Sequence, residues 1–227
     1  MSDRPPPLSI RNLRFRYDAT GAATPWVVDV AALDLNPGEQ MLLTGGSGRG
    51  KSTLLNLIAG LMEPNEGQVL IAGQPVHSLR GAARDRFRGR TIGMIFQTFN
   101  LLHGFSAAEN VMAALMFTDL PPREHRPRAE ALLRHLGIDR PDADADRLSV
   151  GQQQRVAVAR AVACEPALVL ADEPTASLDP DNARAAIDLI QRICREKNAA
   201  LLCVSHDPAM AQRFERTASF DQLGRNA

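Results

Sequence analysis

The chain has 227 residues, of which 44% are hydrophobic and 23% charged, a composition typical of a globular protein with an ample core. Basic and acidic residues balance at 26 each, so no overall charge attracts nucleic acid or an anionic lipid surface. The start, MSDRPPPLSI, lacks the apolar segment of a signal peptide, and the longest uncharged stretch, 91–108, is too polar to span a bilayer. We therefore expect a cytoplasmic protein, unless a partner holds it at a membrane.

The first clear elements are a strand and a helix joined by glycines. A short apolar run at 41–44 indicates a buried strand. Residues 51–61 are apolar on nearly every side of a helical period, which predicts a buried helix. Gly60, or the pair Glu63-Pro64, would end that helix.

The middle of the chain has a helical period from about residue 100 to 163. Two stripes of apolar residues show this helical period, and Gly137 follows the end of the first stripe. The stripes are Ala129, Leu132, Leu133 and Leu136, then Val156, Ala159, Val162 and Ala163. We interpret residues 97–163, approximately, as a helical insertion in a core formed by 1–96 and 164–227.

The last third alternates strands with a helix. The apolar runs 168–171 and 201–204 are typical of parallel strands that are covered on both faces. Between them, Asp181 or Asn182 can cap a helix. This alternation predicts an α/β domain.

The link between the first strand and helix has the pattern of a phosphate-binding loop. Residues 45–52, Gly-Gly-Ser-Gly-Arg-Gly-Lys-Ser, fit G-x-x-x-x-G-K-[ST]. Glycines let successive N–H groups turn toward an anion at the positive end of the following helix. Lys51 would reach the β- and γ-phosphates, and the Ser52 hydroxyl would bind Mg²⁺. Only two of the 26 basic residues are lysine, and a compact ammonium fits among phosphate oxygens better than a planar guanidinium. The loop predicts a nucleotide site.

Two acids follow the predicted strand 168–171. Asp172 can hold Mg²⁺, directly or through water, and Glu173 is placed to polarise a water for attack on the γ-phosphate. A solvated turn is the alternative, which the phosphate loop earlier in the chain disfavours.

A second anion site is predicted at LSVGQQQR, residues 148–155. Ser149 and Gly151 stand at the start of a helix, where hydroxyl and backbone donors are available. Two γ-phosphate sites on different parts of one chain suggest that each serves a different nucleotide. A two-fold dimer with both nucleotides between its subunits satisfies this.

Together the motifs resemble those of ABC-type ATPase subunits, over nearly the whole chain and in the family's order. Residues 45–53 match the Walker A loop, Gln97 the Q-loop and 148–152 the signature motif. Residues 168–173 match Walker B, 177–179 the D-loop and His206 the switch histidine. The resemblance implies an α/β fold with a P-loop NTPase (RecA-like) core, an N-terminal antiparallel β subdomain and an inserted helical subdomain.

The resemblance also implies residue roles and the cofactors ATP and Mg²⁺. Glu173 would be the general base, His206 would contact the γ-phosphate, and Gln97 would complete the Mg²⁺ shell. The catalytic residues would be Lys51, Gln97, Glu173 and His206, and the metal ligands Ser52, Gln97 and Asp172. The nucleotide would be bound by Tyr17, Gly45, Gly46, Ser47, Gly48, Arg49, Gly50, Lys51, Ser52 and Thr53.

A second copy would close the site through its Ser149, Gly151, Gln152 and Asp179. The family usually has glycine where this chain has Val150, whose branched side chain stiffens the backbone and adds bulk near the phosphate. We expect the contact in trans to survive this change.

The remaining aromatic and imidazole groups receive simpler interpretations. Tyr17 follows the strand-like residues 13–16 and lies where the family stacks a ring on adenine; a packing role is the alternative. The other four histidines, interpreted as solvated or satisfied core groups, are His77, His103, His125 and His135.

Three of the eight phenylalanines fall within the ten residues 96–105, beside and just after the Q-loop residue Gln97. The apolar side chains here are Phe96, Phe99, Leu101, Leu102 and Phe105. Core packing is one interpretation, but polar and flexible neighbours indicate exposure, which marks a partner surface. We expect an integral membrane permease to dock near 96–105, because a segment attached to Gln97 would shift with the γ-phosphate.

Residues 92–102 and the short chain resemble one branch of the family, which pairs with permeases of the lipoprotein-releasing, macrolide-exporting and cell-division type. The implied function is to power export or extraction of a lipophilic substrate, from the inner face of the cell membrane. An alternative is an ATP-driven regulator that transmits force to a membrane partner without transport. A soluble ATPase of repair or translation is disfavoured, and no nucleic-acid partner is expected.

Overall fold

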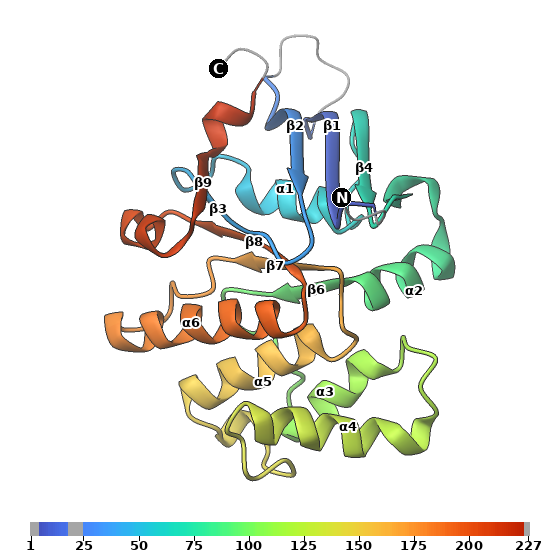
Figure 1. The fold of residues 1–227 in the computed structure, drawn as a ribbon, viewed down its shortest axis with the longest axis vertical. Coiled ribbons are helices and arrows are strands. Elements are labelled where there is room, and N and C mark those ends of the chain that lie inside the picture. Colours follow the sequence, from blue (N-terminus) through green and yellow to red (C-terminus); the bar gives the residue numbers. More distant parts are fainter. Residues whose placement is uncertain (1–4, 18–24, 225–227) are drawn as a thin grey trace.

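The computed structural model describes residues 5–17 and 25–224, which form two sheets with helices between and below them (Figure 1). The antiparallel sheet has the order β2-β1-β4-β5 and the parallel sheet the order β6-β7-β8-β3-β9. The first consists of β1 (Leu8–Phe15), β2 (Val28–Leu35), β4 (Glu66–Ile71) and β5 (Gln74–Pro75). The second consists of β3 (Gln40–Thr44), β6 (Ile92–Ile95), β7 (Leu168–Asp172), β8 (Ala200–Ser205) and β9 (Arg216–Ser219).

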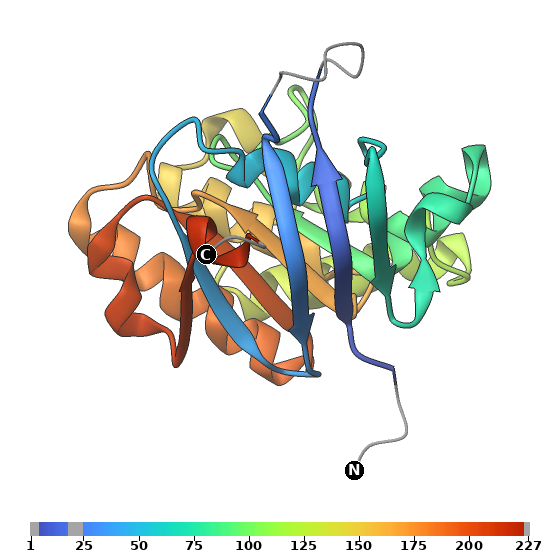
Figure 2. The same ribbon diagram turned by 90° about the horizontal axis from the view of Figure 1, so that it is seen from above.

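The burial of the strands follows their apolar pattern. In β1 and β2 buried residues alternate with more exposed ones, because one face of the antiparallel sheet is solvated. Figure 2 shows this sheet with β1 between β2 and β4. In β8 all six residues are buried, and β7 is buried up to its last residue, Asp172. These two strands lie inside the parallel sheet and are covered on both faces.

Helices cover both faces of the parallel sheet. The helix α1 (Lys51–Ile58) lies between the two sheets, and its apolar side chains share a core with strands of both (Figure 1). The other face packs against α5 and α6, while α3 and α4 lie farther from the sheet and pack against α5; all four contribute to a second core. The bounds are α2 (Gly81–Thr91), α3 (Ala107–Leu115), α4 (Pro122–His135), α5 (Val150–Val162) and α6 (Pro180–Glu196).

The α/β fold with its antiparallel and parallel sheets is confirmed, and three local expectations change. Of the two stops expected for the helix over 51–61, Gly60 is the one used: it takes a left-handed φ of 67°, and the helix ends at Ile58. Leu61 is therefore 50% exposed rather than buried. The cap of α6 is Asp179, not Asp181 or Asn182. Phe99 is buried rather than exposed, in a turn where its φ is +59°.

The three helices α3 to α5 fall between residues 107 and 162, where the helical insertion is expected. Its boundaries at about 97 and 163 stay a prediction. Across the described ranges, no helix combines the length and the apolar character needed to cross a membrane.

Candidate nucleotide site

The phosphate loop holds a row of backbone donors without protein partners. The helix α1 begins at Lys51, with Gly50 before it and no side-chain cap. Within the described residues, the N–H groups of 46–53 make no hydrogen bond, whereas that of Leu54 bonds Gly50 O at 2.8 Å. Free N–H groups at the positive end of a helix form an anion site. The loop is therefore equipped to bind phosphate.

Gly50 sets the shape of this loop. Its φ is +98°, and a Cβ on it would lie 2.4 Å from Val27 O, a contact that real Cβ atoms do not make. Because a side chain here would push β2 away from the loop, only glycine fits at the last position before the helix.

Lys51 places a cation inside the loop. Its ammonium donates to Gly45 O at 2.7 Å and to Gly46 O at 3.0 Å, and its side chain is only 6% exposed. Nζ also lies 3.6 Å from Glu173 Oε1. The other lysine, Lys197, lies elsewhere and pairs with Glu165. The buried cation and the free N–H groups both favour an anionic ligand.

Ser52 and Asp172 meet between the start of α1 and the end of β7. Ser52 Oγ donates to Asp172 Oδ1 at 3.1 Å. Burial raises the pKa of Asp172 above its usual value, the bond from Ser52 lowers it, and the charge of Glu173 raises it further. A carboxylate that burial destabilises gains from a nearby cation.

These two oxygens fit Mg²⁺. A hydroxyl and a carboxylate are the hard donors that this ion prefers, and Mg²⁺ commonly takes its other ligands from water and substrate phosphates. Across the described ranges, no cluster of three or more His, Cys, Asp or Glu side chains could hold a metal by itself. Ser52 and Asp172 therefore suit an ion that arrives with a nucleotide.

Glu173 is fixed by contacts from three directions. Its backbone has a φ of 46°, and its N–H bonds Val204 O at 3.0 Å, so it turns out of β7 beside the end of β8. Oε2 accepts from the His206 N–H at 3.2 Å and lies 2.9 Å from His206 Nδ1. With Lys51 on its other oxygen, Glu173 is 14% exposed. The sequence-predicted base, histidine and lysine are thus brought together at the ends of neighbouring strands.

Tyr17 lies beside the same helix. Its hydroxyl is 3.1 Å from Thr53 Oγ1, and its ring meets Phe15 edge-on at 5.0 Å between centroids. The side chain is 70% exposed, so a face of the ring is open to a ligand. Stacking on adenine stays a prediction.

Three other predicted residues make no hydrogen bond or ion pair with this cluster within the described ranges. Arg49 points outward, 65% exposed, with Nη1 3.9 Å from Asp221 Oδ1. Gln97 is exposed, and its side chain bonds none of the described residues. Asp179 accepts from the N–H groups of Asp181 and Asn182 as the cap of α6. The catalytic, metal and interface roles of these residues stay predictions.

The signature residues form a second cluster of free donors. Ser149 caps α5, accepting from the Gln152 N–H, while Gln152 Oε1 accepts from the Ser149 N–H at 3.0 Å. No hydrogen bond within the described residues uses the N–H groups of Val150 and Gly151. Val150 is 51% exposed, and a Cβ on Gly151 would meet nothing within 4 Å. This helix start is open to a partner.

Two aromatic residues near the loop were missed by sequence reasoning. A Cβ on Gly45 would lie 3.2 Å from Phe220 Cβ, so Phe220 packs behind the phosphate loop. Trp26 carries the guanidinium groups of Arg14 and Arg16 on its ring, at 5.5 and 4.6 Å. Neither position belongs to a motif, and their sequence distance from the loop gave no signal.

The segment after Gln97 is partly a surface. Leu102 and Phe105 are 41% and 48% exposed, whereas Phe99 is only 7% exposed. Leu102 also lines a groove of about 330 Å³, whose other lining is mainly apolar and includes Met94, Phe96 and Phe117. The expected exposure therefore holds for part of the segment.

Comparisons with known proteins agree on one family. The model of the family described as ABC transporter matches residues 28–176. The chain is 41% identical over 210 residues to the lipoprotein-releasing system ATP-binding protein LolD of Pseudomonas syringae pv. tomato, covering 92% of both chains. The LolD of Pseudomonas fluorescens is 40% identical, also with 92% of each chain covered. A structure of the ATP-binding cassette MJ0796, solved as a dimer in a post-hydrolysis state bound to ADP and Pi, is 33% identical, with a TM-score of 0.80 over 93% of both chains.

Proposed function

Because this chain belongs to the ABC transporter family and is one of its ATP-binding subunits, we propose that two copies enclose two ATP molecules and hydrolyse them to drive a membrane partner. Each ATP would lie between the phosphate loop of one copy and the signature residues of the other. The resulting ADP and phosphate would let the dimer open.

One observation carries this proposal: free backbone donors start two helices that lie on opposite faces of the parallel sheet (Figure 1). They belong to α1, after the phosphate loop, and to α5, after Ser149. Within the described residues of one copy, no protein group bonds either set of donors. A phosphate held by both sets needs a second copy. The dimeric MJ0796 cassette, which was solved with ADP and Pi bound, supports the same arrangement for this chain.

Each residue of the site would have its own role in ATP hydrolysis. Lys51 and the free N–H groups of 46–53 would bind the phosphates and hold the γ-phosphate for attack. Glu173 would accept a proton from the attacking water, and His206 would turn from Glu173 toward the γ-phosphate. Ser52 and Asp172 would hold Mg²⁺, which would supply positive charge beside the phosphates. Hydrolysis forms the new P–O bond as the bond to ADP breaks.

A substitution at Glu173 tests the assignment of the base. Glu173→Gln keeps the size and the bond from the His206 N–H but cannot take a proton, so hydrolysis should fall by about 10³-fold while ATP still binds. Glu165→Gln is the matched control, because Glu165 also has a left-handed φ, of 51°, and lies three residues before the start of β7, whereas Glu173 directly follows its end. Normal hydrolysis by Glu173→Gln would exclude Glu173 as the base.

The membrane partner would dock on Leu102, Phe105 and the apolar groove that Leu102 lines. These side chains are exposed without a protein partner, as an interface requires before assembly. The names of the relatives support a lipoprotein-releasing system, so the substrate class we propose is a lipid-anchored protein extracted from a membrane. The subunit would then act at the cytoplasmic face, held there by its partner.

The docking surface can be tested by membrane association in cells that contain the native system. Phe105→Glu places a charge on this surface and should move the chain out of the membrane fraction. Leu61→Glu is the control, since Leu61 is 50% exposed against 48% for Phe105 but lies after α1. Release of both variants, or of neither, would contradict docking at this surface.

A further inference from the structure

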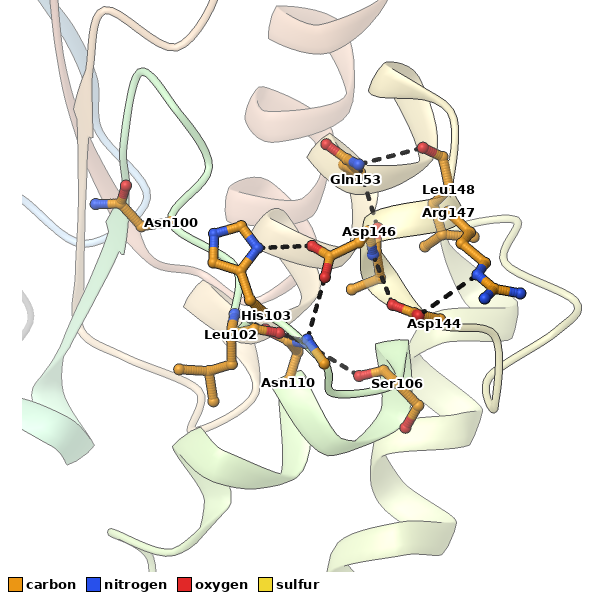
Figure 3. A network of polar contacts seen from close by, with 12 residues as sticks. Asn100, Leu102, His103, Ser106, Asn110, Asp144, Asp146, Arg147, Leu148 and Gln153 are labelled. Atoms are coloured by element: carbon orange, nitrogen blue, oxygen red, sulfur yellow. Dashed lines mark hydrogen bonds and ion pairs between the residues drawn. The ribbon is translucent and has the colours of Figure 1, made fainter.

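The segment after Gln97 is tied to the residues that precede the signature serine by one exposed carboxylate (Figure 3). Asp146 Oδ1 lies 2.8 Å from His103 Nδ1, and Asp146 Oδ2 accepts from the Gly104 N–H at 3.1 Å. The Gly104 N–H, and after it His103, hold the pKa of Asp146 below its usual value. We call the His103–Asp146–Gly104 contacts the clasp.

Backbone hydrogen bonds join the same two segments as the clasp. Ala145 N donates to Phe105 O at 3.0 Å, and Ser106 forms a β-bridge with Asp144. Both partners belong to the turn around Ala145–Arg147, whose own cap is Asp144. The exposed residues 103–105 are thus each held to this turn.

The turn leads directly into the signature. It ends at Leu148, and Ser149 follows as the cap of α5. Gln153, on the first turn of α5, donates to Ala145 O and Leu148 O, both at 3.2 Å (Figure 3). The position of Ser149 therefore depends on the turn, and the clasp holds the turn from outside.

The other end of the segment is anchored to the helices. Arg160 of α5 donates to Phe99 O at 2.7 Å and to Asn100 O at 2.6 Å. Asn110 of α3, which is fully buried, accepts from the Leu102 N–H at 2.7 Å. With these anchors fixed, the clasp is the side-chain tie between the proposed docking residues and the turn before Ser149.

We propose that His103 and Asp146 are positioning residues, whose clasp holds Ser149 in the place where it meets the nucleotide of the second copy. The inference rests on the proposed ATP-bound dimer. Ser149 and Val150 are exposed in the single chain, so their outer side is free to meet a second copy. A helix start that is ordered before binding avoids the entropy cost of ordering it on contact. Since Leu102 and Phe105 flank the clasp, a partner on them would also act on Ser149.

The test uses full-length Glu173→Gln protein and measures the concentration of MgATP at which half of it is dimeric. Asp146→Ala removes both clasp contacts and should raise this concentration about tenfold. His103→Ala removes one contact and should raise it about threefold. Asp146→Asn can still accept from Gly104 and donate to His103, and it should stay within about twofold of the parent.

Two further measurements separate positioning from general damage. Asp142→Ala is the control, because Asp142 is exposed in the same region and pairs with Arg126 at 2.8 Å, away from the clasp. The affinity of each single chain for ADP should not change, since the phosphate loop is intact. A tenfold effect of Asp146→Ala with unchanged ADP affinity supports the inference.

Two results would overturn it. If Asp146→Ala dimerises at the same ATP concentration as Asp142→Ala, the clasp does not position Ser149. If its ADP affinity falls in proportion, the damage lies in the fold or the phosphate loop. Failure of the parent Glu173→Gln protein to dimerise in ATP is a different outcome, which removes the proposed dimer and the inference with it.

Discussion

Two helices that pack against each other, α3 and α5, begin with the same capping motif but differ in what surrounds it. In each, the serine side chain accepts a hydrogen bond from the backbone N–H three residues later, and the side chain of that later residue accepts one from the serine N–H. The pairs are Ser106 with Glu109 and Ser149 with Gln152. Local sequence alone would assign them one role.

The backbone donors separate the two. The N–H groups of Ala107 and Ala108 bond Ala143 O and Pro141 O at 2.9 and 2.8 Å, so the start of α3 is satisfied by the protein. Those of Val150 and Gly151 have no such partner in the described ranges. The α3 cap also carries an acid, whereas the α5 cap carries a neutral amide. Of these two helix starts, only that of α5 therefore offers unpaired donors to an anion, and the capping motif by itself does not identify such a site.

The largest expected effect comes from an acid at each cap serine. Ser149→Asp should keep α5 capped, because aspartate caps as well as serine, but its charge would face the phosphate. We expect ATP-dependent dimerisation of Glu173→Gln protein to weaken about 100-fold. Ser106→Asp should leave dimerisation unchanged, and sedimentation over a range of ATP concentrations measures both. Equal losses would mean that the two caps do not differ in function.

A smaller effect is expected from making the α5 cap resemble that of α3. Gln152→Glu preserves the length of the side chain and its bond to the Ser149 N–H, but it adds a charge within the first turn. Dimerisation should weaken about tenfold, and more at low salt, because the repulsion is screened. The salt dependence distinguishes repulsion from a packing defect, which would persist at high salt.

Val150 tests the contribution of shape. Val150→Gly removes an exposed side chain beside the proposed phosphate contact and should strengthen dimerisation about threefold. Glycine at the start of α5 should also lower the free energy of unfolding by about 0.5 kcal/mol. Denaturant titration and the dimerisation assay separate the two. Weaker dimerisation would indicate that the valine itself contacts the partner copy.

The smallest effect concerns pH at the α3 cap. The Ser106 N–H, and after it the Ser106 hydroxyl, hold the pKa of Glu109 below its usual value of 4.5. Glu109 therefore contributes stability that is present above pH 4.5 and lost as the pH falls through its folded pKa. At pH 7, Glu109→Gln should melt at a lower temperature than the parent protein, and this difference in melting temperature should narrow as the pH falls. A difference that widens in acid would contradict a lowered pKa for Glu109.

The phosphate loop and the acids after β7 could be predicted because the residues of each motif are consecutive in the sequence. The cap of α6 also had a local signal: Asp179 precedes Pro180, which suits the first position of a helix. The burial of Phe99 had no such local signal in the sequence, since it depends on a turn in which Phe99 has a positive φ. Asp146 and His103 are 43 residues apart, and only the folded chain brings them into contact.

The mass of Glu173→Gln protein in solution tests the central claim that each copy holds half of each nucleotide site. With MgATP, the account predicts that the particle doubles from the 24.7 kDa of one chain, and that MgADP leaves it at that mass. A protein that binds ATP and stays at 24.7 kDa, or that doubles equally in ADP, would contradict the account.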